Sequence, residues 1–247
     1  MSEETVKEYL KSNIALLEKM INSNYQDSRS IQRRINDMKE WLKSPTLLKP
    51  DKNASYSEVI EIELNQIKEP IVACPNDPDN VKVISDVCHT QIDEVFIGSC
   101  MTNIGHYRAA AKVLEGVGKI QSKLWICPPT KMDEEVLKKE GYYKIFEECG
   151  ARLELPGCSL CMGNQARVND GAVVFSTSTR NFDNRLGKNA QVFLGSAELA
   201  AVSALLGRIP EPDEYLEIAK NKIDPYSKDL YRYLQFDEIP DMSLSKN

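Results

Sequence analysis

Apolar residues in the N-terminal part of the chain recur every three or four positions, which is the spacing of an amphipathic helix. The first such stripe runs through residues 3–23. A second stripe follows Asp27 and Ser28, either of which can cap a helix, and it ends before Pro45. Residues 1–44 are therefore predicted to form a helical hairpin. Its inner positions are Val6, Leu10, Ile14, Leu17, Ile21, Ile31, Ile35, Met38, Trp41 and Leu42.

The next stretch, residues 45–91, is predicted to be a connector with an edge strand. It opens with a polar run over residues 44–55 that contains two prolines. Residues 59–64 then alternate between apolar and acidic side chains, which predicts a half-buried strand. Pro75 and Pro78 interrupt the chain again. Nothing in these first 91 residues indicates a reaction.

From about residue 92 the pattern changes to short apolar runs separated by helical ones. This alternation predicts an α/β domain with a mostly parallel sheet, extending over residues 92–247 and ending in a helical tail. The predicted strands lie at residues 95–97, 124–126, 152–155, 173–175 and 192–194. The predicted helices lie at residues 104–116, 132–149, 196–206 and 213–222, with a packed tail at 226–236.

Composition and charge narrow the classes of protein. Of the 247 residues, 42% are apolar and 28% charged, as in soluble globular proteins. The net charge of −6 provides no general positive field for nucleic acid, and the basic cluster at residues 29–34 is interpreted as a solvated helix face, so RNA binding is not expected. No apolar run approaches the ~18 residues of a membrane span.

The cysteines and the N-terminal residues indicate the compartment. Seven cysteines in 247 residues are too few for a disulfide scaffold, and their number is odd. The acidic start Met1-Ser2-Glu3-Glu4 does not resemble a signal peptide. We therefore expect a cytoplasmic protein whose reduced thiols are available to a metal.

Three of the cysteines follow predicted strands. Cys100 comes just after the strand at residues 95–97, and Cys158 and Cys161 come just after the strand at 152–155. Loops from the carboxyl ends of parallel strands converge on one edge of a sheet. We therefore expect the three sulfur atoms to meet, although Cys100 lies 58 residues before Cys158.

Two arginines follow another predicted strand. Arg180 and Arg185 come after the strand at residues 173–175, and so should reach the same edge. The guanidinium group prefers bidentate contact with carboxylates. Two of them beside a metal therefore indicate a small substrate with more than one carboxylate.

The residues alone leave the metal open, because three thiolates with a free fourth position suit either zinc or a four-iron cluster. His106 follows Cys100 by six residues and could complete a structural Cys3His zinc site. The other cysteines, Cys74, Cys88, Cys127 and Cys149, are interpreted as ordinary reduced thiols.

Three segments decide between these possibilities by resemblance. Residues 97–106, 156–167 and 176–185 closely resemble motifs of the aconitase family. The Cys-Met-Thr-Asn sequence at residues 100–103 and Thr179 are similar to the bacterial B type within it. The resemblance extends over most of the chain and implies an aconitase-type three-layer α/β/α domain, preceded here by the short helical hairpin.

The resemblance also implies a cofactor and a reaction. Cys100, Cys158 and Cys161 would each bind one iron of a [4Fe-4S] cluster and leave the fourth iron open. Arg180 and Arg185 would hold carboxylates of citrate, isocitrate or cis-aconitate. The family reaction is the hydro-lyase interconversion of citrate and isocitrate through cis-aconitate, and the B type is also associated with 2-methylisocitrate.

One part of the family's machinery has no counterpart in this sequence. The catalytic base of the family is a serine on a swivelling domain, and no Gly-Ser-Ser-Arg-like segment occurs here. We therefore expect no catalytic base in this chain, and an incomplete enzyme that is inactive without the remaining aconitase domains. Alternatives are a zinc-binding structural module, an RNA-binding role and, within the enzyme class, an isopropylmalate isomerase, which Cys-Met-Thr-Asn disfavours.

Overall fold

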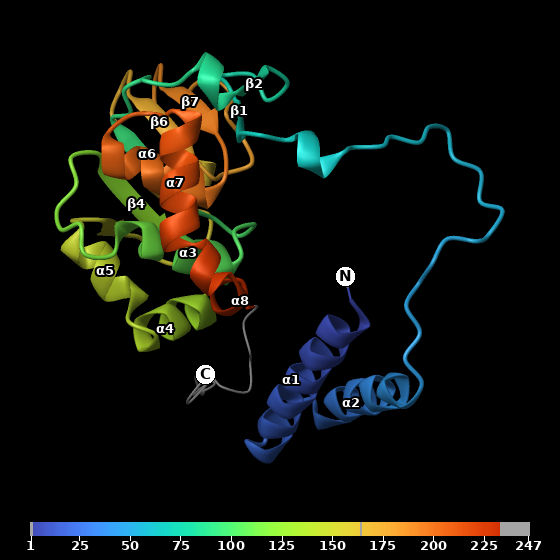
Figure 1. Ribbon diagram of the computed structural model, residues 1–247. Coiled ribbons are helices and arrows are strands. Elements are labelled where there is room, and N and C mark those ends of the chain that lie inside the picture. The colour runs from blue at the N-terminus through green and yellow to red at the C-terminus, as the bar shows by residue number, and fades with distance from the viewer. Residues whose placement is uncertain (1, 164, 233–247) are drawn as a thin grey trace. The chain divides into compact units, whose positions relative to one another are not determined.

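The computed structural model describes residues 2–163 and 165–232 (Figure 1). The chain divides into an N-terminal unit that contains Met1–Glu63 and a larger unit, Leu64–Leu234. Each unit has its own apolar core. No helix in the described ranges combines the length and the apolar character needed to cross a bilayer.

The N-terminal unit contains the predicted helical hairpin, formed by α1 (Glu3–Asn22) and α2 (Ser28–Lys43). The side chains of Ser2 and Asp27 cap the two helices by accepting hydrogen bonds from N–H groups of their first turns. The inward positions that the stripe predicts form the core of the pair: Ile14, Leu17, Ile31 and Ile35.

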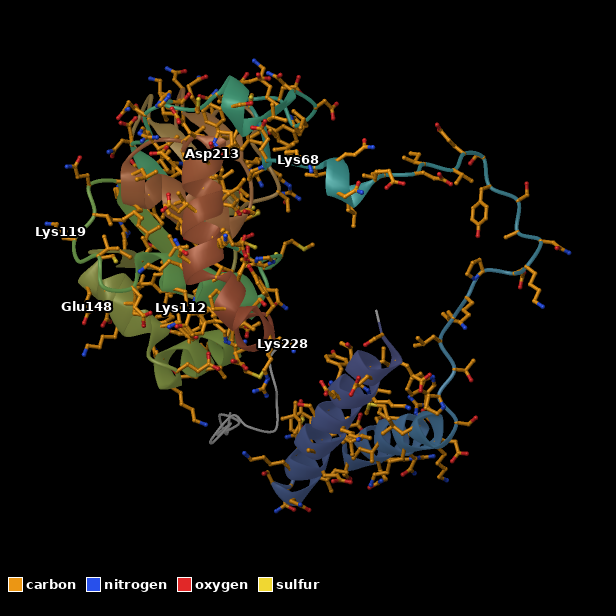
Figure 2. The ribbon with its side chains drawn as sticks, viewed as in Figure 1. Lys68, Lys112, Lys119, Glu148, Asp213 and Lys228 are labelled. Atoms are coloured by element: carbon orange, nitrogen blue, oxygen red, sulfur yellow. The ribbon has the colours of Figure 1, made fainter. Side chains whose placement is uncertain are left out.

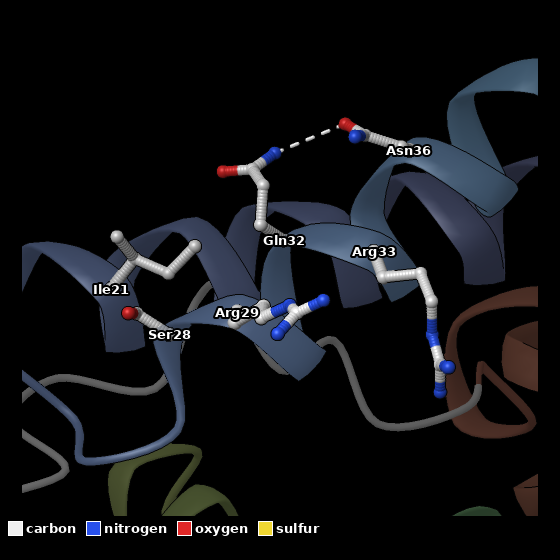
Figure 3. Close-up of a pocket in the computed structure, with 6 residues that line it drawn as sticks. All are labelled: Ile21, Ser28, Arg29, Gln32, Arg33 and Asn36. Carbon is white, nitrogen blue, oxygen red and sulfur yellow. Dashed lines mark hydrogen bonds between the residues drawn. The ribbon is translucent and has the colours of Figure 1, made fainter.

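A polar hollow lies on the hairpin surface, beside Ile21 and the first turns of α2 (Figure 3). Arg29 and Arg33 line it, and the Gln32 amide donates a hydrogen bond of 3.0 Å to Asn36. It contains no cysteine or carboxylate. The chemistry that the sequence indicates therefore belongs to the larger unit.

The larger unit is built on a seven-stranded sheet with the order β2-β1-β7-β6-β3-β4-β5. The last five strands of this order run parallel, while β1 is antiparallel to both of its neighbours. The strands are β1 (Ile71–Ala73), β2 (Val81–Val83), β3 (Glu94–Gly98), β4 (Lys123–Cys127), β5 (Arg152–Leu153), β6 (Val173–Ser176) and β7 (Gln191–Leu194).

The chain crosses the sheet in two directions. It moves from β3 to β4 and β5 on one side, and then returns to β6 and β7 on the other side of β3. Because crossovers between parallel strands are right-handed, the two sets of connections cover opposite faces. Neighbouring strands β3 and β6 are thus the place where the direction reverses, which is where α/β sheets bind ligands.

Helices cover one face of the sheet. They are α3 (Ile104–Leu114), α4 (Lys131–Lys139), α5 (Tyr142–Glu148), α6 (Ala197–Leu206), α7 (Pro212–Lys222) and the short α8 (Ser227–Leu230) (Figure 1). Side chains of β3 and β4 that point to this face, such as Val95 and Leu124, are fully buried against them. The predicted helix at 132–149 is divided at Gly141, whose φ of 86° only glycine adopts without strain.

Irregular chain covers the other face. Phe96, Trp125 and Val174 point this way and pack against Leu160 and Leu186 of the returning connections. These connections contain only a 3-10 turn, Ser159–Met162, among their described residues. The α/β class, the mostly parallel sheet and the preceding helical hairpin are confirmed, but this layer is formed by loops rather than α-helices, because its glycines, asparagines and serines favour turns.

One predicted element is wrong. Residues 59–64 form no strand in the structure, and the side chains of Val59, Ile60 and Ile62 are 72%, 75% and 68% exposed. An alternating pattern gives a strand only where a neighbouring strand supplies hydrogen bonds, and no described strand lies beside this segment. The edge of the sheet comes instead from β1 and β2, later in the same predicted connector.

The segment that follows α7 packs against α3. Arg108 forms a bidentate ion pair with Glu140 (2.7 and 2.8 Å), and its third nitrogen donates to the carbonyl oxygen of Leu230 (3.3 Å). Lys112, labelled in Figure 2, places its ammonium 4.6 Å from the ring centre of Tyr226. These contacts bury Leu230 and hold the tail on the helical layer.

The packing of the end of β3 predicts a destabilising substitution. A Cβ atom at Gly98 would lie 2.7 Å from the carbonyl oxygen of Cys127, so Gly98→Ala must displace backbone. We expect the free energy of unfolding to fall by about 1–3 kcal/mol in urea denaturation.

The control is Ser203→Ala in the interior of α6, where the fully buried hydroxyl has no hydrogen-bond partner among the described residues. Removing that hydroxyl should leave stability unchanged or raise it by up to about 1 kcal/mol. Equal losses in the two variants would contradict the packing argument.

Candidate metal centre

Cys100 lies in the tight turn that joins β3 to α3. The Thr102 hydroxyl donates to the carbonyl oxygen of Gly98 (2.8 Å), and the Thr102 N–H donates to that of Ser99 (3.0 Å). The Asn103 side chain then caps α3 by accepting from the Gly105 N–H (2.9 Å). With its neighbours held in this way, Cys100 is left exposed at the carboxyl edge of the sheet.

Cys158 and Cys161 lie on the 3-10 turn that follows β5. The Cys161 N–H donates to the carbonyl oxygen of Cys158 (3.0 Å), which places the two side chains on one turn. Gly163 ends the turn with φ 64°, and a Cβ atom there would collide with the carbonyl oxygen of Arg185. Glycine is therefore required where the turn meets the arginine loop.

Residues at the end of β4 form hydrogen bonds with the segment that leads into this turn. The Cys127 thiol lies 3.3 Å from the carbonyl oxygens of both Leu155 and Gly157. The Gly157 N–H in turn donates to the carbonyl oxygen of Pro128 (2.9 Å). Burial raises the pKa of Cys127 to about 12, so its thiol stays protonated at neutral pH and keeps its hydrogen-bond donor.

The cysteines of the two loops come together. Burial raises the pKa of Cys158, and a hydrogen bond with Cys100 and the nearby charges of Cys100 and Cys161 raise it further. The charge of Arg180 acts in the opposite direction. These effects require short separations, so residues from the ends of three strands share one neighbourhood.

As they stand, the sulfur atoms do not form a finished metal site. Within residues 2–163 and 165–232, no three Cys, His, Asp or Glu side chains are grouped closely enough to hold a metal ion. Cys100, Cys161 and Arg180 nevertheless lie close enough to Cys158 to shift its pKa. The donor set itself, thiols only, suits iron–sulfur or zinc chemistry.

The side chains of Arg185 and Arg167 donate hydrogen bonds to the cysteine turn. The Arg185 Nε donates to the carbonyl oxygen of Cys161 (2.9 Å), and one of its terminal nitrogens lies 3.5 Å from the sulfur of Met162. The Arg167 Nε donates to the carbonyl oxygen of Gly163 (2.8 Å). Sequence reasoning assigned no role to Arg167, although it closes the second of the three motifs.

The loop that contains Arg180 is tied to β3 and to β1. The Thr177 hydroxyl exchanges hydrogen bonds of 2.9 Å with both the N–H and the carbonyl oxygen of Gly98. The buried Asn181 amide donates to the carbonyl oxygen of Cys74, just after β1 (2.9 Å). These side chains were missed, because their partners lie 79 and 107 residues away in the sequence.

The His106 side chain forms a hydrogen bond with a carboxylate and is not grouped with the three cysteines. Its Nδ1 lies 2.8 Å from a carboxylate oxygen of Glu198, which also accepts a hydrogen bond from the Tyr231 hydroxyl (2.7 Å). The hydrogen bond to Glu198 raises the pKa of His106 against the effect of burial. Burial alone would raise the pKa of Glu198, but His106 and Tyr231 together lower it. His106 therefore joins α3, α6 and the tail.

The remaining cysteines lie apart from this arrangement. Cys74 and Cys149 are buried, and the thiol of Cys88 donates to the carbonyl oxygen of Ser85 (3.3 Å). Burial raises the pKa values of Cys74 and Cys149. Neither is a strong nucleophile at neutral pH.

The sequence matches the model of a known protein family. The model of the Aconitase family (aconitate hydratase) matches residues 84–207, which contain all three cysteines and all three arginines of this edge. The chain belongs to the aconitase family.

Individual relatives indicate the type of aconitase to which the chain is most similar. The chain is 64% identical over 239 residues to aconitate hydratase B of Synechocystis, covering 97% of this chain and 28% of the relative. It is 55% identical to aconitate hydratase B of Escherichia coli, with the same coverage. A 3-isopropylmalate dehydratase large subunit of Syntrophus aciditrophicus is 39% identical over 173 residues, covering 68% of this chain and 41% of the relative. This aconitase chain thus spans less than a third of the B-type relatives.

The contact between His106 and Glu198 predicts a pH-dependent stability. The folded state raises the pKa of His106 above its ordinary 6.5, so the stabilisation is present below pH 6.5 and is lost as the pH rises through the folded pKa. Solvent screens this half-exposed imidazole, so we expect a loss of about 0.5 kcal/mol. The free energy of unfolding is measured by urea denaturation between pH 5 and 9 for the wild type and for His106→Gln. The variant should not show the decrease in stability at higher pH that His106 causes.

His89→Gln is the control, because His89 pairs with Glu211 and not with the tail. It should retain the pH dependence contributed by His106. A His106→Gln curve that is parallel to the wild-type curve across this range would contradict the assignment.

Proposed function

We propose that this chain is the [4Fe-4S]-binding part of an aconitate hydratase, with Cys100, Cys158 and Cys161 as the ligands. The observation that supports it most is that the loops after β3 and β5, two strands that both pair with β4, bring Cys100 and Cys161 close enough to Cys158 to raise its pKa. The 64% identity to an aconitate hydratase B supports the same activity for the longer protein, interconversion of citrate and isocitrate. Dehydration of 2-methylisocitrate is included in the proposal.

The donor set fits such a cluster. Thiolate ligands from two loops and a glycine-flanked turn suit a bulky inorganic core, and the peptide N–H groups of the turn suit its sulfides. When bound, the cluster would supply a Lewis-acidic iron with a free coordination position for the substrate. The cysteines of this chain would hold it at the carboxyl edge of β3 and β5.

Arg180 and Arg185 would bind and orient substrate carboxylates. Neither makes an ion pair with an acidic side chain in the described part of the chain, so their charge is available to a ligand. Arg185 is fixed by its Nε at the Cys161 carbonyl oxygen and by one terminal nitrogen at the Met162 sulfur, which leaves the other terminal nitrogen for a carboxylate. Arg180 would neutralise negative charge beside Cys158. The two would hold the substrate in one orientation.

Removal of water also needs a base, which we assign to the part of the longer enzyme outside this chain. The proposal therefore includes the remaining aconitase domains as partners, and a tricarboxylate as substrate. Within the family, the 64% identity to aconitate hydratase B exceeds the 39% identity to the 3-isopropylmalate dehydratase subunit, so the citrate reaction is preferred.

The ligand assignment is tested by anaerobic reconstitution followed by iron and sulfide counting. We expect about four irons and four sulfides per chain, as in a [4Fe-4S] cluster. Cys158→Ser should lose most of both. Cys149→Ser is the matched control, because that buried thiol packs in the apolar core and lies 3.7 Å from the carbonyl oxygen of Leu114. Unchanged iron in Cys158→Ser would refute the assignment, and one zinc without sulfide would favour a structural zinc site.

The incomplete machinery predicts an inactive chain. After reconstitution to full iron content, the chain alone should produce no measurable cis-aconitate from citrate, because it contains no base for the proton that is lost. Ultraviolet absorbance of the unsaturated product provides the assay. Turnover by the isolated chain at the rate of a complete enzyme would show that a base had been overlooked.

A further inference from the structure

Of the seven arginines in the larger unit, six fall into two groups. Arg108, Arg152 and Arg208 each form an ion pair with a glutamate, at 2.7, 2.6 and 2.7 Å. Arg167, Arg180 and Arg185 have no such pair in the described part of the chain. A guanidinium group at this edge that has no carboxylate partner keeps its charge and its N–H donors available to a dissolved anion.

Arg167 lies beside Arg185 at the cysteine turn. Its Nε is fixed at the carbonyl oxygen of Gly163 (2.8 Å), and a terminal nitrogen lies 3.9 Å from where a Cβ of Gly163 would be. That same Cβ position abuts the backbone of Arg185. Arg167 and Arg185 therefore flank one glycine, two residues after Cys161.

The anchoring of Arg167 resembles that of Arg185. In each, the Nε–H donates a hydrogen bond to a carbonyl oxygen of the cysteine turn, which fixes the guanidinium plane. Terminal N–H groups then remain for a ligand. A guanidinium group fixed in this way loses less entropy when it binds a carboxylate than a freely rotating side chain does. Its exposure gives a dissolved anion access to it.

We propose that Arg167 is a third substrate-binding guanidinium, which makes the site prefer three carboxylates over two. This inference rests on the proposed function, because it takes Arg180 and Arg185 as the contacts for the other carboxylates. Arg167 would then determine specificity among small polycarboxylates, without taking part in bond breaking.

The experiment uses the reconstituted 247-residue chain and isothermal titration calorimetry with two probes, citrate and malate, at equal ionic strength. Citrate has three carboxylates and malate has two. We expect Arg167→Gln to weaken citrate binding at least tenfold and malate binding less than twofold. Arg167→Lys, which keeps the charge without the planar fork, should lie between wild type and Arg167→Gln for citrate.

Arg33→Gln is the control of equal charge change, because Arg33 lines the hollow on the separate helical hairpin (Figure 3). It should leave both affinities unchanged. Iron and sulfide are counted in every variant, because Arg167 also holds the turn. Arg167→Gln should retain both, and their loss would show that Arg167 only supports the turn, which would overturn the inference.

Two further results would overturn the inference. One is a change of less than twofold in citrate binding by Arg167→Gln, and the other is an equal weakening of citrate and malate. The proposed function is judged separately. If Arg180→Gln and Arg185→Gln leave both affinities unchanged, the substrate role of those arginines fails whatever Arg167 does, and iron counting decides the cluster.

Discussion

The paired hydrogen bonds between Thr177 and Gly98 hold together the two strand ends on which the site depends. They join β3 and β6 where the chain reverses its direction across the sheet. The loop after β3 contains Cys100, and the loop after β6 contains Arg180. This link extends the backbone pairing of β3 and β6 by side-chain hydrogen bonds, which restricts the movement of one loop relative to the other. The reversal itself follows from topology, because right-handed crossovers must change face when the direction of travel changes.

Much of the fold could be predicted from periodicity. The five parallel strands and the helices at 104–114, 197–206 and 212–222 follow short apolar runs and helical stripes closely. Residues 59–64 show where this reasoning fails, since alternation does not tell whether a partner strand exists. The loop layer on the second face was also missed. Its core residues, such as Leu160 and Leu186, are single apolar positions in polar sequence and show no period.

The candidate site could be predicted only in part. The strand-end rule predicts that Cys100, Cys158 and Cys161 lie at one edge, together with Arg180 and Arg185. It could not reveal the hydrogen bonds that support them, because those bonds join residues far apart in sequence, such as Asn181 and Cys74. Nor could it separate Arg167 from the paired Arg152. That distinction depends on whether a carboxylate lies within reach, and this is known only after folding.

The high pKa of Cys127 has a chemical consequence for the whole edge of the sheet. A thiol with a pKa of about 12 is almost never a thiolate in the cell, and oxidants, electrophiles and soft metal ions react with thiolates. Cys100, in contrast, is exposed. The thiol that ties the cysteine turn to the end of β4 therefore resists such reagents, and the support of this edge stays in place when exposed thiols are modified.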